Sequence, residues 1–209
     1  QTGAITGRLA SSSPNLQNIP IRSEVGQLIR RGFVTDPGWT FLSADYSQVE
    51  LRILAHISQD ETLLRAFRED QDIHTATAAA IYGIPPETVT KNQRRFAKVI
   101  NFGLIYGMGA FRLARETGLT LSEAENYVKK YFGQFPGIER YLNATRQKAR
   151  TDGYVETLFG RRRYFPVFRT SAGSANRQAV QRAEREAVNQ PIQGTAADII
   201  KVAMIRLDA

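Results

Sequence analysis

The sequence predicts a helix-rich α+β fold, and three observations support this. Helical periodicity covers most of the chain after residue 47. Patterns typical of strands occur at 40–46 and in a hairpin over 154–166. The strand at 40–46 and the last helical region flank a block of helices, which indicates a helical insertion.

The N-terminal part predicts a loop followed by a strand. Residues 1–23 are rich in Gly, Ser, Asn and Pro and have no sustained period, which is typical of a loop. A turn pattern, Asp-Pro-Gly, occupies 36–38, and the segment TFLSADY follows at 40–46. We expect this segment to form a strand, with Asp45 near its end.

A helix is expected directly after this strand, over 48–58. Ser47 is a suitable N-cap residue, and Glu50 stands three positions later, so the pair predicts a capping box. Val49, Ile53 and Ile57 then recur along one side of the helix.

The remaining elements follow the same periodicity. We expect helices at 61–69, 75–82, 91–105, 121–132 and 137–150, a hairpin turning at Gly160, and a final helical region from about residue 175. This last region is expected to be interrupted at Pro191 and Gly194.

Composition restricts the classes of partner. The net charge is +8, from 28 basic against 20 acidic residues, which favours a polyanionic partner such as nucleic acid. The absence of cysteine excludes disulfides and thiolate metal sites. An apolar run of membrane-spanning length and a leader peptide are both lacking, so we expect no membrane partner and a cytoplasmic location. Both ends lie inside expected elements, which suggests a piece of a larger protein.

The helix expected at 91–105 carries an unusual pattern. Arg94, Lys98, Phe102 and Tyr106 step along one side at four-residue spacing, with Asn101 and Ile105 beside them. The opposite side, the expected core face, holds Phe96, Val99, Ile100, Gly103 and Leu104. Two cations followed by two rings suit a nucleoside triphosphate, since the cations can neutralise phosphate and a ring can stack on the base. A solvated basic face with aromatic contacts to a neighbouring helix remains an alternative.

Four segments in order resemble family A DNA polymerases, the bacterial DNA polymerase I type. They are TGRLASSSPNLQNIP at 6–20, DYSQVELR at 45–52, RRFAKVINFGLIYG at 94–107 and NQPIQGTAAD at 189–198. The resemblance implies a palm with a partial antiparallel sheet, formed by 1–52 and 174–209, with 53–173 as an inserted helical fingers subdomain. The palm would be incomplete, and the remaining polymerase domains, the thumb among them, would be partners of this segment.

The resemblance also implies a metal-dependent active site. Asp45 would bind two Mg²⁺ ions, with the Tyr46 carbonyl as a further ligand, because hard cations prefer oxygen ligands. Glu50 would close the space that a ribose 2′-hydroxyl needs. The family's third motif, which supplies a second metal-binding aspartate, has no counterpart here: Asp208 directly follows the helical segment KVAMIRL without a hairpin. We therefore expect the 209 residues alone to be inactive.

Roles in nucleotide binding follow from the same resemblance. The implied set is Gln48, Glu50, His74, Arg94, Lys98, Phe102 and Tyr106. Lys98 would also be catalytic, as a proton donor to the departing pyrophosphate. Phe102 would stack on the incoming nucleotide, and Tyr106 would lie at the templating position. His74 would contact the phosphates, although without the resemblance it is equally well a structural residue of its helix.

A third group of residues is implied to bind DNA. It comprises Arg8, Asn15, Gln17 and Asn18 in the N-terminal loop and Arg185, Asn189 and Gln193 in the last helical region. The amides of Asn189 and Gln193 would probe minor-groove acceptors, which are nearly the same for every correct pair and so report pairing without reading sequence. The arginines at 161–163 have two interpretations, phosphate contact or solvated surface.

Three functions are therefore considered. The first is template-directed DNA synthesis, as the palm-and-fingers segment of a DNA polymerase that transfers deoxynucleotides to a primer 3′-hydroxyl. The second is a non-catalytic segment that binds primer–template DNA and nucleotide. The third, a single-subunit RNA polymerase, is disfavoured by Glu50 and by the segments at 6–20 and 189–198.

Overall fold

The computed structural model describes residues 4–21, 23–169 and 176–208. These residues form a helix-rich α+β fold with a small two-stranded antiparallel sheet, as the sequence predicts. The helices are α1 Glu24–Arg31, α2 Val49–Ser58, α3 Glu61–Arg68, α4 Ile73–Tyr82, α5 Lys91–Ile105, α6 Ala110–Thr117, α7 Leu121–Gln134, α8 Pro136–Asp152 and α9 Arg177–Asp208, with short 3₁₀ turns at Leu16–Asn18, Pro86–Thr88 and Pro166–Phe168. The strands are β1 Tyr154–Glu156 and β2 Arg162–Tyr164.

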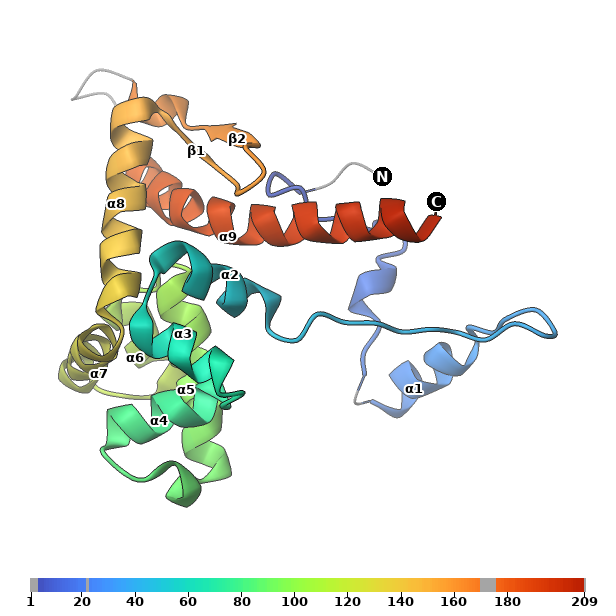
Figure 1. Cartoon of the computed structure of the whole chain (residues 1–209), viewed down its shortest axis with the longest axis horizontal. Helices are drawn as coiled ribbons and strands as arrows, with labels where there is room; N and C mark the ends of the chain where they lie inside the picture. The colour runs from blue at the N-terminus through green and yellow to red at the C-terminus, as the bar shows by residue number, and fades with distance from the viewer. Residues whose placement is uncertain (1–3, 22, 170–175, 209) are drawn as a thin grey trace.

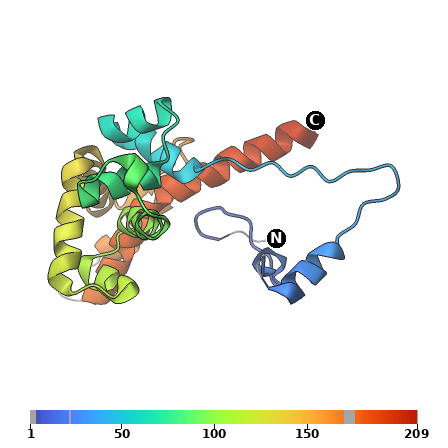
Figure 2. The same ribbon diagram turned by 90° about the horizontal axis from the view of Figure 1, so that it is seen from below.

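One helical body contains most of the core. Its buried apolar side chains come from α2 to α8 and from the middle of α9, and include Leu54, Ile100, Leu104, Leu142 and Ile192. Figures 1 and 2 show α9 as a long rod leaving this body, while α1 and the chain that leads to α2 lie apart from it. The site described below lies on the helical body.

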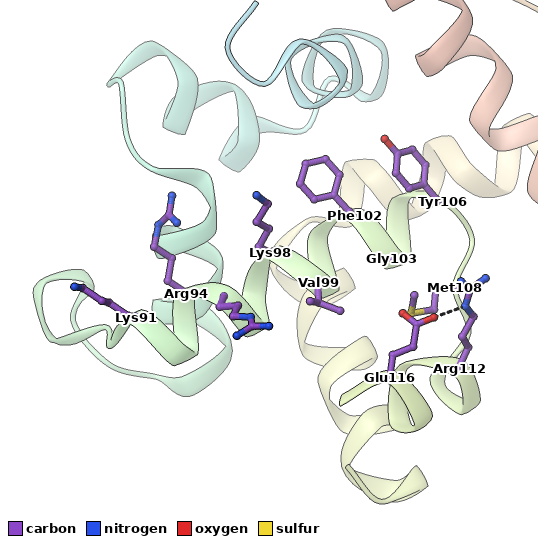
Figure 3. Close-up of a pocket in the computed structure, with 11 residues that line it drawn as sticks. Lys91, Arg94, Lys98, Val99, Phe102, Gly103, Tyr106, Met108, Arg112 and Glu116 are labelled. Atoms are coloured by element: carbon purple, nitrogen blue, oxygen red, sulfur yellow. Dashed lines mark hydrogen bonds and ion pairs between the residues drawn. The ribbon is translucent and has the colours of Figure 1, made fainter. Parts of the chain in front are cut away.

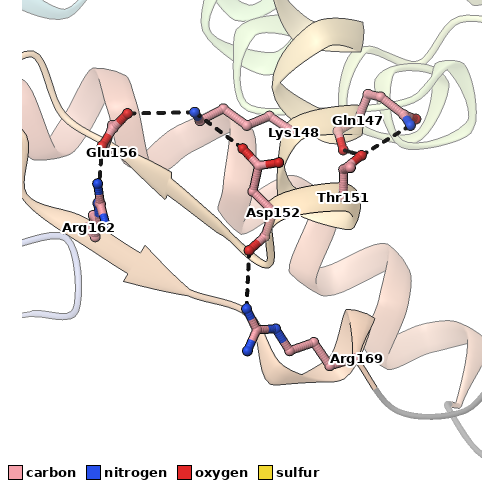
Figure 4. A network of polar contacts seen from close by, with 7 residues as sticks. All are labelled: Gln147, Lys148, Thr151, Asp152, Glu156, Arg162 and Arg169. Carbon is pink, nitrogen blue, oxygen red and sulfur yellow. Dashed lines mark hydrogen bonds and ion pairs between the residues drawn. The ribbon is translucent and has the colours of Figure 1, made fainter.

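The hairpin is confirmed by the structure. Tyr154 pairs with Tyr164 and Glu156 with Arg162, and the turn contains Gly160 at φ +78°, a value that favours glycine. An ion pair connects the hairpin to α8, since Glu156 contacts Lys148 at 3.6 Å, and Glu156 also pairs with Arg162 across the hairpin at 3.3 Å (Figure 4). The hairpin is therefore fixed to α8 by charge as well as by the packing of Val155.

The strand expected at 40–46 is wrong. Residues 41–46 are extended but unpaired, and the side chains of Phe41 and Leu42 are 65% and 91% exposed. A strand needs a neighbour to complete its ladder of hydrogen bonds. Among the described residues the two strands β1 and β2 pair with each other, so the β-type composition of 40–46 has no partner there.

The capping box expected at Ser47 and Glu50 is also wrong. The cap of α2 is Gln48, which adopts a left-handed conformation at φ +53° and makes no side-chain cap bond. This turn moves Ser47 one residue too far from the helix to cap it. The Ser47 carbonyl instead accepts a hydrogen bond from Arg52 Nε at 3.0 Å.

Helix α9 is not interrupted at Pro191 or Gly194. It is one helix of 32 residues that includes both positions. Proline removes one backbone hydrogen bond and crowds the preceding turn. The residues around it are buried against the core, among them Ala187, Val188 and Ile192, so packing holds the helix through this point.

The helices α1 and α6 were not predicted, although Ser23 caps α1 by accepting from Gly26 N at 3.1 Å.

Candidate nucleotide and DNA site

Helix α5 presents its cations and rings on one side, as its periodicity predicts. Arg94 and Lys98 are exposed, and Phe102 and Tyr106 are half-buried. The rings of Phe102 and Tyr106 lie 6.2 Å apart at an interplanar angle of 27°. Figure 3 shows all four side chains pointing to the same side of the helix. The helix begins at a capping box formed by Thr90 and Gln93, which fixes this register.

A groove of about 700 Å³ runs along α5. Its lining includes the basic residues Lys91, Arg94, Arg95, Lys98 and Arg112, together with Phe102 and Tyr106. Arg112 is neutralised by Glu116 at 2.7 Å (Figure 3), whereas Lys98 has no ion-pair partner among the residues described. The groove is therefore positive at one end and aromatic at the other.

Asp72 holds Arg94 in place. Its Oδ2 accepts from Arg94 Nη2 at 2.5 Å and Nε at 3.1 Å, and its Oδ1 caps α4 by accepting from Thr75 N at 2.8 Å. Burial opposes ionisation of this carboxyl, but the hydrogen bonds from Arg94 and Thr75 outweigh it and lower the pKa of Asp72. The guanidinium is thus held beside the start of α4.

His74 lies beside this face on α4. The centroid of its ring is 5.6 Å from that of Phe102. Its side chain belongs to a buried polar cluster with Thr77 and Asn101, in which Asn101 Nδ2 lies 3.1 Å from His74 Nδ1. The periodicity placed Asn101 and Ile105 beside the exposed stripe. The structure buries both, because α4 packs against that side of α5.

The residues expected to bind metal precede α2. Asp45 and Tyr46 are exposed, with Tyr46 48% accessible, and Asp45 has no ion-pair partner in the described ranges. Three or more His, Asp or Glu side chains are nowhere grouped to hold an ion within the described part of the chain. Asp45 therefore offers one carboxylate, and these residues do not form a full magnesium site.

Glu50 and Gln48 are half-buried at the start of α2. Burial raises the pKa of Glu50, and the positive charge of Arg8 partly opposes this rise. Arg8 is therefore near enough to act electrostatically on the proposed gate. Gln48 Oε1 is sealed from solvent and has no hydrogen-bond partner among the described residues.

Arg161 brings the N-terminal loop to α9. Its guanidinium donates to Thr6 O at 2.7 Å, to Gly194 O at 3.1 Å and to Asp198 Oδ1 at 2.9 Å. Inside the same loop, Asn15 Oδ1 accepts from Gln17 N at 3.2 Å, and Gln17 Nε2 donates to Leu9 O at 3.2 Å. These side chains stabilise the loop, which carries exposed Arg8 and Asn18.

The three consecutive arginines of the hairpin are all in ion pairs. Arg161 pairs with Asp198, Arg162 with Glu156, and Arg163 with Glu186. Phosphate contact by Arg161 and Arg163 would have to replace half-buried pairs, so the structure favours a structural role for them. Their partners lie on other elements, so local sequence patterns could not indicate them.

Of the three DNA residues expected on α9, Arg185 lies against the end of α5. Arg185 is exposed, and its Cγ would lie 3.1 Å from a Cβ added at Gly107, just after Tyr106. Asn189 and Gln193 are half-buried, and Asn189 Oδ1 is sealed from solvent without a partner in the described residues. Arg185 thus places α9 beside the aromatic end of the groove.

The model of DNA polymerase family A matches residues 1–209. The chain belongs to this family. Similar curated relatives include the thermostable DNA polymerase I of Thermus filiformis, 53% identical over 99% of this chain, and DNA polymerase I of Chloroflexus aurantiacus, 55% identical over 99%. The chain spans about a quarter of the length of these relatives, 24% and 21% respectively.

A solved family A polymerase has the same fold. The POL domain of Pol1 from M. smegmatis, in complex with DNA primer–template and dNTP, aligns with a TM-score of 0.89 and 46% identity. The alignment covers 98% of this chain and 36% of that domain. None of the helices in the described ranges is both long and apolar enough to cross a membrane.

Proposed function

We propose that this chain is the palm-and-fingers segment of a DNA polymerase that transfers deoxynucleotides to a primer 3′-hydroxyl, directed by a DNA template. The observation that carries the proposal is the α5 face, where Arg94 and Lys98 precede the stacked rings of Phe102 and Tyr106 beside His74. Family membership supports it, and the named POL domain is a relative seen with primer–template and dNTP.

In this proposal the triphosphate lies along α5. Arg94 and Lys98 bind its phosphate oxygens, and Phe102 stacks on the base, with Tyr106 next to the templating position. The primer 3′-hydroxyl loses its proton to solvent and its oxygen bonds to the α-phosphorus, while the bond from that phosphorus to the bridging oxygen breaks and pyrophosphate leaves. Lys98 donates a proton to the departing pyrophosphate, and Glu50 excludes a ribose 2′-hydroxyl.

Two Mg²⁺ ions belong to the proposal as cofactors, but this segment would supply part of their site. Asp45 and the Tyr46 carbonyl would be ligands, and a second carboxylate is not grouped with Asp45 among the described residues. Bound ions would supply charge neutralisation at the phosphates. The remaining polymerase domains would provide the missing ligand and the thumb.

The DNA side of the proposal uses the N-terminal loop and α9. Arg8, Asn15, Gln17 and Asn18 would contact the primer–template from the loop, and Arg185, Asn189 and Gln193 from the helix. The net charge of +8 supports a polyanionic partner. Such an enzyme would work in the cytoplasm, at the nucleoid.

The test is primer extension by the polymerase that carries these residues, alongside the 209-residue chain alone. We expect magnesium-dependent extension by the former and none by the latter. Asp45→Ala should abolish extension, and Lys98→Ala should reduce it strongly, while Lys129→Ala, an exposed lysine on α7, should not. Extension unchanged in Asp45→Ala would refute the assignment.

A binding-only function is the remaining alternative. It predicts that the wild-type polymerase holds primer–template and nucleotide but never extends the primer, at any metal concentration. Measuring retention of labelled nucleotide on a primer that lacks its 3′-hydroxyl separates binding from chemistry.

A further inference from the structure

The two ring nitrogens of His74 have different surroundings. Nδ1 lies 3.1 Å from Asn101 Nδ2. Nε2 has no hydrogen-bond partner within the described residues, and it is not among the polar atoms sealed from solvent. His74 and Asn101 are 4% and 1% exposed, so the Nδ1 contact is made without bulk water.

The hydrogen bonds of Thr77 and Asn101 determine which nitrogen carries the proton. Thr77 Oγ1 lies 2.7 Å from the Ile73 carbonyl, which can only accept, so the hydroxyl gives it its single proton. A lone pair of the same oxygen faces Asn101 Nδ2 at 3.0 Å. One amide proton of Asn101 therefore goes to Thr77 and the other points at His74 Nδ1.

The reverse orientation of the Asn101 amide is less favourable. With oxygen and nitrogen exchanged, the amide would have one acceptor, Thr77 Oγ1 at 3.1 Å, and its second N–H would be left without one. Buried N–H groups without an acceptor are rare, whereas carbonyl oxygens with a vacant lone pair are more often tolerated. The orientation in the structure satisfies both amide protons.

The surroundings of the ring favour its neutral form. Burial lowers the pKa of His74; the nearby Asp72 carboxylate opposes this, and the charges of Arg94 and Lys98 lower the pKa further. These charged groups face the ring from the start of α4 and from α5. A neutral imidazole that accepts at Nδ1 must carry its proton on Nε2.

We propose that Asn101 is a positioning residue that fixes His74 as an Nε2–H donor toward the triphosphate held along α5. The proposal rests on the proposed function for its ligand, the triphosphate of an incoming deoxynucleotide. The relay from Ile73 O through Thr77 and Asn101 sets the tautomer before the nucleotide arrives. A phosphate oxygen can then accept directly from Nε2–H, and the proton of the histidine does not have to move to the other ring nitrogen.

Asn101→Asp is the decisive variant because a carboxylate can only accept. It would draw the proton to Nδ1, leaving a lone pair on Nε2 at high pH, while protonation at low pH would restore a donor there. The quantity of interest is the nucleotide affinity of the variant divided by that of wild type at the same pH. We expect this ratio to fall about tenfold from pH 6 to pH 9, because one hydrogen bond to a charged group is lost. Taking this ratio cancels titration of the nucleotide itself.

The measurement is dissociation of the correct deoxynucleoside triphosphate from the polymerase on a primer that lacks its 3′-hydroxyl. Asn126→Asp, which adds the same charge at an exposed position of α7, should leave the ratio independent of pH. Thr77→Val should weaken binding by breaking the relay, and Thr77→Ser, which keeps the hydroxyl, should restore it. A ratio for Asn101→Asp that does not change with pH overturns the proposal.

A second readout needs no nucleotide. Isotope-labelled histidine reports the tautomer through its ring chemical shifts, and His74→Gln identifies which of the two histidines of the chain gives each signal. We expect the Nε2–H form in wild type and the Nδ1–H form or imidazolium in Asn101→Asp. An Nδ1–H form in wild type overturns the proposal. Failure of wild type to bind nucleotide while showing the Nε2–H form contradicts the proposed function and leaves the relay established.

Discussion

Asp60 joins two helices through a single buried carboxylate. It is 2% exposed; its Oδ1 accepts from Leu63 N at 3.0 Å at the start of α3, and its Oδ2 accepts from Gly137 N at 2.7 Å at the start of α8. Gly137 has no room for a side chain, since an added Cβ would lie 2.7 Å from Asp60 Cα. The carboxylate therefore satisfies backbone donors at two helix N-termini.

We expect Asp60→Ala to cost about 3–5 kcal/mol of unfolding free energy. Loss of an N-cap costs about 1 kcal/mol, and a hydrogen bond to a charged group contributes about 1.5–3 kcal/mol. The substitution also leaves two backbone N–H groups buried without partners. Asp60→Asn should cost less, because one amide oxygen can still cap α3 while the amide nitrogen faces Gly137 N–H.

Urea denaturation followed by circular dichroism measures these differences. Thr120→Ala is the matched control: Thr120 caps α7 in an exposed capping box and should cost about 1 kcal/mol. The slope of free energy against urea should stay unchanged. A cost for Asp60→Ala no larger than that of Thr120→Ala would refute the double-cap reasoning.

Three further outcomes are expected. The folded pKa of His74 lies below its ordinary value of 6.5, so the unfolded chain binds more protons near and below pH 6.5. The urea midpoint should therefore fall as pH drops from about 6.5 through the folded pKa. The same dependence of the midpoint on pH in His74→Gln would contradict this. Gly194→Ala places a Cβ 2.6 Å from Thr157 Cγ2, so it should destabilise the chain by about 1–3 kcal/mol, seen as a lower Tm; an unchanged Tm would argue against this packing. Glu50→Ala should raise ribonucleotide incorporation relative to deoxynucleotide incorporation in primer extension, and equal ratios in variant and wild type would remove Glu50 from the gate role.

Local features of the sequence predicted α5 well. Its bounds are 91–105 as expected, because periodicity and the Thr90 cap both lie within a few residues of the helix. The same periodicity placed Arg94, Lys98, Phe102 and Tyr106 on one accessible side. Whether a segment forms a helix, and which of its residues share a face, are thus decided by residues close in the sequence.

Features that depend on distant partners were not predictable in this way. Asn101 is buried because Thr77 and His74, 24 and 27 residues earlier, meet it across the contact of α4 with α5. The segment 40–46 has strand composition but lacks a described neighbour to pair with. Gln48 adopts a left-handed backbone conformation that its residue type does not predict, and this conformation displaced the expected cap.

Helix α9 sets a fixed spacing between the regions proposed to bind nucleotide and DNA. Arg185 stands near Gly107 at the end of α5, and Asp198 is held to the N-terminal loop through Arg161. Thirteen residues at about 1.5 Å each separate the two by about 20 Å along the helix axis. The helix fixes both the distance and the relative direction of Arg185 and Asp198. One residue inserted between these two would lengthen the helix by about 1.5 Å and turn Asp198 by about 100° away from Arg161. The relation between the proposed nucleotide face and the proposed DNA loop therefore depends on a residue count, which tolerates substitutions far better than insertions or deletions.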